Sequence, residues 1–149
     1  MNAAEQKVIS DVETFGWHVV LVSDDEEGPG FAFTIGLFRN YQHPEVIIFG
    51  IPHAVAHAVL NSVGEAVKAG TRLSSGDRKV EFLKDQTCAF VVFPRNSYEA
   101  YLGFARWFYK GNEFPALQCV WPDSNGHFPW EAAAAESTRS RQPVPGVVV

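Results

Sequence analysis

The sequence contains little cysteine, little basic charge and no long apolar run. Two cysteines in 149 residues are too few for a disulfide scaffold. Twelve Lys and Arg residues stand against 17 Asp and Glu residues, and the net charge of −5 excludes a strongly basic nucleic-acid-binding protein. The densest apolar run, Val46 to Ile51, is far shorter than the roughly 18 residues that suggest a membrane span. We therefore expect neither nucleic acid nor a membrane as a partner.

Several targeting and catalytic signals are also missing. The chain shows no Gly-rich phosphate loop, no Cys-rich zinc spacing and no order of residues typical of a Ser-His-Asp triad. The start of the chain, Met1 to Lys7, lacks the apolar segment of a secretory signal, which predicts a cytoplasmic protein. Cys88 and Cys119 both lie in apolar runs, so we expect two buried thiols, as suits a reducing compartment.

The residues that are present predict a small globular domain. Hydrophobic residues make up 46% of the chain and charged residues 19%, and the 12 Phe residues predict an aromatic core. The first 30 residues carry seven acids and one base, whereas residues 66–110 carry eight bases and four acids. This charge separation would suit either head-to-tail association of copies of the chain or a basic partner.

Apolar periodicity predicts one α+β domain over residues 1–131, with about six strands and three helices. We expect a mostly antiparallel sheet or a partly open barrel, followed by a flexible C-terminal tail over residues 132–149. The expected helices span 3–15, 52–69 and about 97–110, and the expected strands span 17–22, 31–35, 45–50, 80–83, 87–93 and 117–121.

Two segments carry a family resemblance. The first runs from Phe31 through Thr34, Gly36 and Leu37 to His43-Pro44-Glu45, and the second is Trp121-Pro122-Asp123. With Gly16-Trp17, these segments resemble a family of small bacterial proteins catalogued as a domain of unknown function. Its pattern is aromatic-x-aromatic-Thr-x-Gly-Leu, His-Pro-Glu and a late Trp-Pro-Asp. The resemblance covers about residues 8–131 and implies a cytoplasmic bacterial protein, with no activity attached.

A looser analogy concerns the fold alone. A strand that ends in Thr-x-Gly-Leu, followed by a short loop, Pro44 and an apolar strand, is similar to part of the flavin reductase split barrel. That analogy implies a flavin-binding oxidoreductase as an alternative function, but it transfers no cofactor residue.

The strongest candidate residues for binding lie between residues 34 and 45. Thr34 and Gly36 share the less bulky face of their strand, which leaves room either for a packed helix or for a ligand. His43 and Glu45 are two residues apart and could share a face. As a functional pair, Glu45 would orient His43 as a general base. As a structural pair, Pro44 would fix the strand entry and Glu45 would bond loop amides.

Tryptophans mark the other candidates. Trp121 and Trp130 bracket a polar turn, and Asp123 is a candidate acceptor for an indole N–H. The turn is either a loop held by aromatic anchors or the lining of a pocket or protein contact. Trp107 lies at the edge of an unusually aromatic helix and is a candidate interface anchor.

Three histidines allow a further hypothesis. His53 and His57 are four residues apart, which places both rings on one helical face as a metal pair requires, and His43 lies shortly before them. Boundary histidines on an ordinary helix explain the same pattern, and no metal is our main expectation.

These observations favour a module that binds a small molecule or a protein, with catalysis left open. The alternatives are a flavin-binding oxidoreductase and a metal-dependent hydrolase. The pattern leaves open the cofactor, the ligand, the strand order and the oligomeric state.

Overall fold

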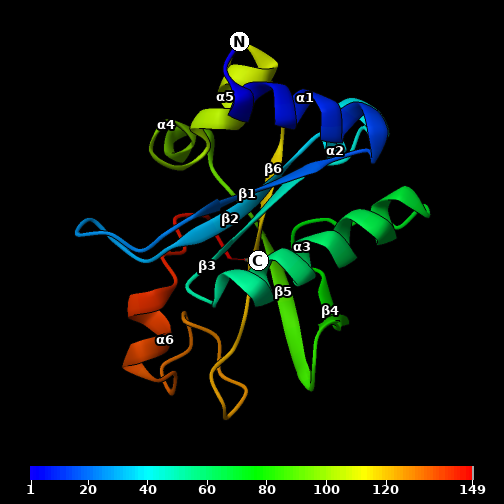
Figure 1. The fold of residues 1–149 in the computed structure, drawn as a ribbon. Helices are drawn as coiled ribbons and strands as arrows, with labels where there is room; N and C mark the ends of the chain where they lie inside the picture. Colours follow the sequence, from blue (N-terminus) through cyan, green and yellow to red (C-terminus); the bar gives the residue numbers. More distant parts are fainter. Residues whose placement is uncertain (149) are drawn as a thin grey trace.

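The structure, a computed structural model, describes residues 1–148. Six strands form one open, mixed sheet in the order β1-β2-β3-β6-β5-β4 (Figure 1). All neighbouring strands are antiparallel except β3 and β6, which are parallel. The strands are β1 (His18–Val22), β2 (Phe31–Ile35), β3 (Glu45–Phe49), β4 (Arg78–Leu83), β5 (Gln86–Val92) and β6 (Ala116–Val120).

This topology confirms the α+β class and the six strands. Four of the five strand pairs are antiparallel, as expected for a mostly antiparallel sheet, and the parallel β3–β6 pair makes the sheet mixed. The alternative of a partly open barrel is wrong, because the sheet has two free edges at β1 and β4. The analogy to the split barrel therefore has no support in the fold. The parallel pair arises because the chain leaves β3 through a helix and a hairpin before it returns as β6.

Strand β3 lies in the interior of the molecule, and all five of its residues are buried. Val46 and Ile48 pack into the cluster that contains α3 (His53–Lys68), whereas Ile47 and Phe49 pack into the cluster on the opposite face. Successive side chains on a strand point to opposite faces, so the uninterrupted apolar run 46–49 reflects burial on both sides.

Helix α3 approaches the sheet closely at a glycine. A Cβ atom on Gly64 would lie 2.3 Å from the ring of Trp17, so only glycine fits this contact. The indole nitrogen of Trp17 donates a hydrogen bond to Asn61 Oδ1 at 3.0 Å, which fixes the ring against the helix.

The opposite face is covered by α1 (Ala3–Thr14), α4 (Tyr98–Tyr101) and α5 (Gly103–Tyr109). A capping box between Asn2 and Glu5 starts α1, as the sequence predicts. The single helix expected over about 97–110 is broken instead, because Leu102 leaves helical geometry at φ −108° and ψ 37°. A 3₁₀ turn, Arg95–Ser97, precedes α4.

The described chain therefore has six α-helices rather than three. Two of them lie outside the expected helical segments: α2 (Leu37–Tyr41) and α6 (Glu136–Arg141). Each is six residues or shorter, too short to show the apolar periodicity on which the expectation rested. No helix among residues 1–148 is long and apolar enough to cross a bilayer.

The segment after residue 131, set apart as a tail by composition, contains α6 and reaches the sheet. Gln142 is 2% exposed, and its side chain accepts from the amide of Trp121 and donates to the carbonyl of the same residue. From β6, Gln118 Nε2 donates to the carbonyl of Pro143 at 2.7 Å. The last residue of that segment, Val149, lies outside the described residues.

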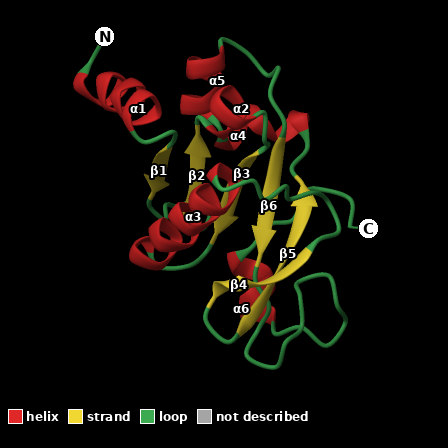
Figure 2. Ribbon diagram, turned by 90° about the vertical axis from the view of Figure 1, so that its right-hand side faces the viewer, coloured by secondary structure: helices red, strands yellow, loops and turns green. Residues whose placement is uncertain are grey.

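The two ends of the sheet carry different elements. Glu45 pairs with Ala116 at the end where α1, α2, α4 and α5 gather, and the loop after β6 leaves from the opposite end, near α6 (Figure 2). Cys88 and Cys119 are buried within the sheet and unpaired, as predicted.

Candidate functional site

A buried carboxylate joins four elements at one end of the sheet. Glu45, the first residue of β3, is 1% exposed and accepts hydrogen bonds on both of its oxygens. The donors are Thr34 Oγ1 at 2.8 Å, the amides of Gly36 at 3.0 Å and of Leu37 and Phe38 at 3.2 Å, and the hydroxyl of Tyr109. Glu45 therefore connects β2, α2, β3 and α5.

The turn between β2 and α2 presents these amides to Glu45. Gly36 has φ +118°, and a Cβ atom there would lie 2.7 Å from the carbonyl oxygen of Gly16. Only glycine fits this backbone conformation and this contact. The turn directs the first N–H groups of α2 inward, where they have no helical partner of their own. Thr34 and Gly36 thus bind Glu45 rather than lining an open space.

Burial governs the electrostatics of this centre. Desolvation raises the pKa of Glu45, and the hydrogen bonds from Tyr109, Thr34 and the amides oppose that rise. Burial and the nearby Glu45 charge raise the pKa of the Tyr109 hydroxyl, which stays protonated and donates to the carboxylate.

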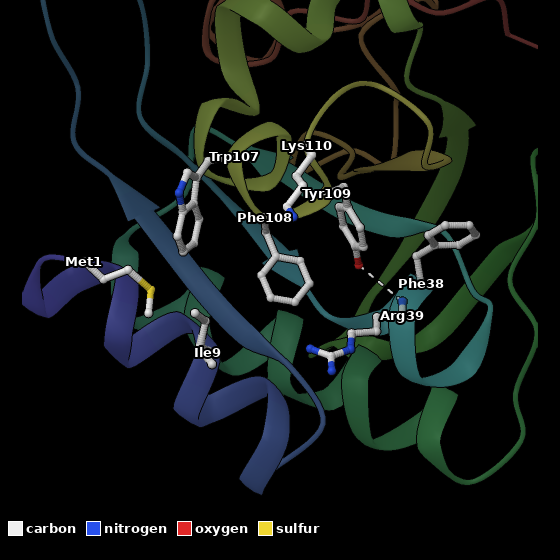
Figure 3. A pocket seen from close by; sticks show the side chains of 8 residues that line it. All are labelled: Met1, Ile9, Phe38, Arg39, Trp107, Phe108, Tyr109 and Lys110. Atoms are coloured by element: carbon white, nitrogen blue, oxygen red, sulfur yellow. Dashed lines mark hydrogen bonds between the residues drawn. The ribbon is translucent and has the colours of Figure 1, made fainter.

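The ring of Tyr109 lines a pocket beside this centre (Figure 3). The pocket has a volume of about 710 Å³, within the range of small-molecule sites. Its walls come from the start of the chain, from α2 and from the end of α5. The lining residues are Met1, Ile9, Phe38, Arg39, Trp107, Phe108, Tyr109 and Lys110.

The pocket combines aromatic walls with two cations. The guanidinium carbon of Arg39 lies 5.8 Å from the ring centre of Phe108, and Lys110 follows directly after α5. Among residues 1–148, no Asp or Glu lines the pocket. Trp107, expected to anchor an interface, is half-buried in one wall and packs edge-on against Phe104 at 5.7 Å.

The structure separates His43 from Glu45. His43 is fully buried; its Nδ1 donates to the carbonyl of Pro44 at 2.8 Å, and its Nε2 accepts from the amide of Leu73 at 2.9 Å. Burial lowers the pKa of His43, which matches a neutral ring with both nitrogens occupied. Glu45 does not orient His43, because their hydrogen bonds lead to different elements.

The loop flanked by Trp121 and Trp130 lies at the far end of the sheet. The indole of Trp121 donates to the carbonyl of Phe49 at 2.7 Å, not to Asp123 as expected. Asp123 instead accepts from the amides of Asn125, His127 and Ala135, each at 2.9 Å. Trp130 stacks on Phe128 with ring centres 5.1 Å apart. This loop does not meet the residue 34–45 region in one pocket.

The three histidines of the metal hypothesis have separate partners. His53 Nε2 donates to the carbonyl of Val22 at 3.0 Å, whereas His57 lies beside Asn61 on the same helix. Within residues 1–148, no three His, Cys, Asp or Glu side chains are placed to hold a metal ion.

The expected site residues did not include most of the pocket. Of the residues that line the pocket, the sequence patterns predict a binding role for Trp107 alone. The aromatic run 107–109 between two basic residues is the visible signal for its neighbours. The bond between Tyr109 and Glu45 joins residues 64 positions apart, which no local pattern reveals.

Comparison with known proteins places the chain in a family. No curated protein and no solved structure matches it. A family profile matches residues 11–135, which include both motif segments and all six strands of the sheet. The resemblance expected from the sequence is thereby confirmed: the chain belongs to the family described as Domain of unknown function (DUF4262).

Proposed function

We propose that the protein is a binding module that takes a small molecule with an apolar body in the pocket between α1, α2 and α5. The pocket itself carries this proposal. It is large enough for a drug-sized molecule, and six of its eight lining residues are aromatic or aliphatic. Pockets of this kind, with a few polar groups at defined places, are the usual sites of small-molecule binding.

The Glu45 centre supports the proposal because it holds two of the pocket walls. Glu45 bonds the amides at the start of α2 and the hydroxyl of Tyr109 at the end of α5. The Tyr109 hydroxyl also accepts from the amide of Arg39 at 3.3 Å, as Figure 3 shows. A pocket with fixed walls loses little conformational entropy when a ligand binds, which favours affinity.

The hydrogen bonds of Glu45 and His43, the pair considered for catalysis, favour binding over chemistry. Glu45 is buried and accepts from donors on both oxygens, and both ring nitrogens of His43 are occupied by backbone groups. A general base needs a free nitrogen or oxygen within hydrogen-bond reach of its substrate.

The test uses a neutral apolar fluorophore, N-phenylnaphthylamine, titrated into the purified full chain. We expect saturable enhancement of its fluorescence by the wild type and loss of most of it in Trp107→Ala, which removes one wall. Trp130→Ala is the matched control, because it removes a partly buried indole at the opposite end of the sheet. Circular dichroism checks that both variants are folded.

Two results would overturn the proposal. One is absence of saturable binding by the wild type. The other is equal binding by wild type and Trp107→Ala, with loss of binding in Trp130→Ala, which would move the site to the loop after β6.

We also infer that the protein works in the cytoplasm of a bacterium. The resemblance to small bacterial proteins supports the source, and the two buried, unpaired cysteines fit a reducing compartment. Fractionation of a bacterial host with an antibody against the chain tests the location; recovery from the periplasm would contradict it.

A further inference from the structure

We infer that the ligand of this pocket is an amphipathic organic anion, whose apolar body lies against the aromatic walls and whose negative head lies between Arg39 and Lys110. This inference rests on the proposed function and adds the chemical class of the ligand.

The charge around the pocket is opposite in sign to that of the protein. Arg39 and Lys110 line the pocket, and no Asp or Glu of the described part of the chain does so, whereas the chain as a whole has a net charge of −5. A local excess of positive charge beside a low-dielectric wall attracts an anion and orients it. An apolar molecule without charge would use only the walls.

Arg39 and Lys110 have no carboxylate partner among residues 1–148. The ion pairs of the described chain all lie elsewhere, such as Lys7 with Asp11 and Arg141 with Asp24. The backbone of Arg39 is held by the Tyr109 hydroxyl, and its guanidinium lies over Phe108. The guanidinium of Arg39, which would bind the anion, is therefore already held at the wall of the pocket.

Lys110 occupies a backbone position that suits glycine better. Its φ is +59°, in the left-handed region, and it closes α5 as the C-terminal cap. Glycine takes this conformation without steric cost, so the helix end does not itself require lysine. A cation near a helix C-terminus also interacts favourably with the helix dipole, and unfolding experiments on the variant separate that effect from ligand binding.

An aromatic pocket can instead receive an organic cation through its ring faces. Here the guanidinium of Arg39 already lies over Phe108, and a second cation would meet repulsion from both Arg39 and Lys110. The anion is thus the occupant that the charges favour.

The experiment compares three probes with the same ten-carbon chain: decanoate, decanol and decyltrimethylammonium. Each is titrated below its micelle concentration into the full protein, with binding followed by calorimetry or tryptophan fluorescence. We expect decanoate to bind about tenfold more tightly than decanol, and the ammonium probe to bind most weakly. Added NaCl should weaken decanoate binding and leave decanol binding unchanged.

Two variants test the cations. Arg39→Gln and Lys110→Gly should each weaken decanoate binding by about fivefold and leave decanol binding unaltered. Lys110→Gly also removes the steric strain of a side chain at a left-handed backbone position, so this variant should fold at least as stably as the wild type. Lys84→Gln, in the exposed β4–β5 turn, is the matched control and should change nothing.

The outcomes separate this inference from the proposed function. Equal binding of decanol and decanoate, or tightest binding of the ammonium probe, would overturn the anion while leaving the pocket as the binding site. If decanoate binds more tightly than decanol and keeps this advantage in both variants, its carboxylate does not lie between Arg39 and Lys110. That result would also overturn the inference. Failure of all three probes to bind would overturn the proposed function together with this inference.

Discussion

The hydroxyl of Tyr109, the last residue of α5, donates a hydrogen bond to the carboxylate of Glu45, the first residue of β3, across 64 residues of sequence. The same hydroxyl accepts from the amides of Gly36 and Arg39 at 3.3 Å. The contact of the buried Glu45 with the partly buried Tyr109 therefore sets the distance between the sheet, α2 and α5. The same contact holds the ring of Tyr109 in place as one wall of the pocket.

Replacement of Glu45 by alanine should strongly destabilise the protein. Three amides and two hydroxyls would lose a buried acceptor, and such losses cost about 3–5 kcal/mol in total. Urea denaturation of Glu45→Ala measures the change. Glu113→Ala is the control, because that side chain is 89% exposed and its loss should cost less than about 0.5 kcal/mol. Similar midpoints for the two variants would contradict a structural role for Glu45.

The Glu45 carboxyl should also make stability depend on pH. Its pKa is raised above the ordinary value of 4.5, so the folded state binds the proton more tightly than the unfolded chain. This contribution to the free energy of unfolding is fully present below pH 4.5 and is lost as pH rises through the folded pKa. Glu45→Gln cannot titrate, so the wild type should lose stability relative to this variant over that range. A constant difference would show that the pKa is not raised.

His43 should produce the opposite dependence. Its pKa is lowered from the ordinary value of 6.5, so below that pH the unfolded chain binds the proton more tightly than the folded state. The free energy of unfolding should therefore fall as pH decreases through 6.5 towards the lower folded pKa. His43→Asn should remove this slope, whereas replacement of the exposed His57 by asparagine should retain it. Urea denaturation at a series of pH values measures both, and a slope kept in His43→Asn would refute the assignment.

The two cysteines should be inert in the native protein. Both are fully buried, and the pKa of Cys119 is raised by a hydrogen bond with Cys88 and by burial, so little thiolate forms. We expect no labelling by a maleimide without denaturant and labelling of both thiols in urea, read by mass spectrometry. Ser124→Cys, at an exposed turn, supplies a native-state positive control. Rapid native labelling of Cys88 or Cys119 would show that the sheet opens locally.

Sequence reasoning succeeded where a residue's neighbours in the chain decide its environment. The start of α1 follows from Asn2 and Glu5, which cap each other three residues apart. The burial of β3 on both faces follows from its uninterrupted apolar residues. The sequence also suggests two roles for Glu45, and the structure shows the second of them: Glu45 accepts hydrogen bonds from loop amides rather than orienting His43.

The same reasoning failed where the hydrogen-bond partner of a side chain lies far away in the sequence. Asp123 is the nearest carboxylate to Trp121 in sequence, yet the indole bonds the carbonyl of Phe49 on another strand. His43 and Glu45 are close in sequence, but they bond to Leu73 and Tyr109, which lie in different parts of the fold. Proximity in the chain did not predict proximity in these cases.

The sequence by itself determined the family, the α+β class, the six strands and the character of the core, because these depend on composition, short motifs and local apolar patterning. Only the tertiary structure decided the parallel pairing of β3 with β6, the junction at Glu45 and the pocket with its two cations. These features join segments many residues apart, and their geometry follows from how the helices pack on the sheet. Local periodicity specifies which face of an element is buried but not which distant element covers it.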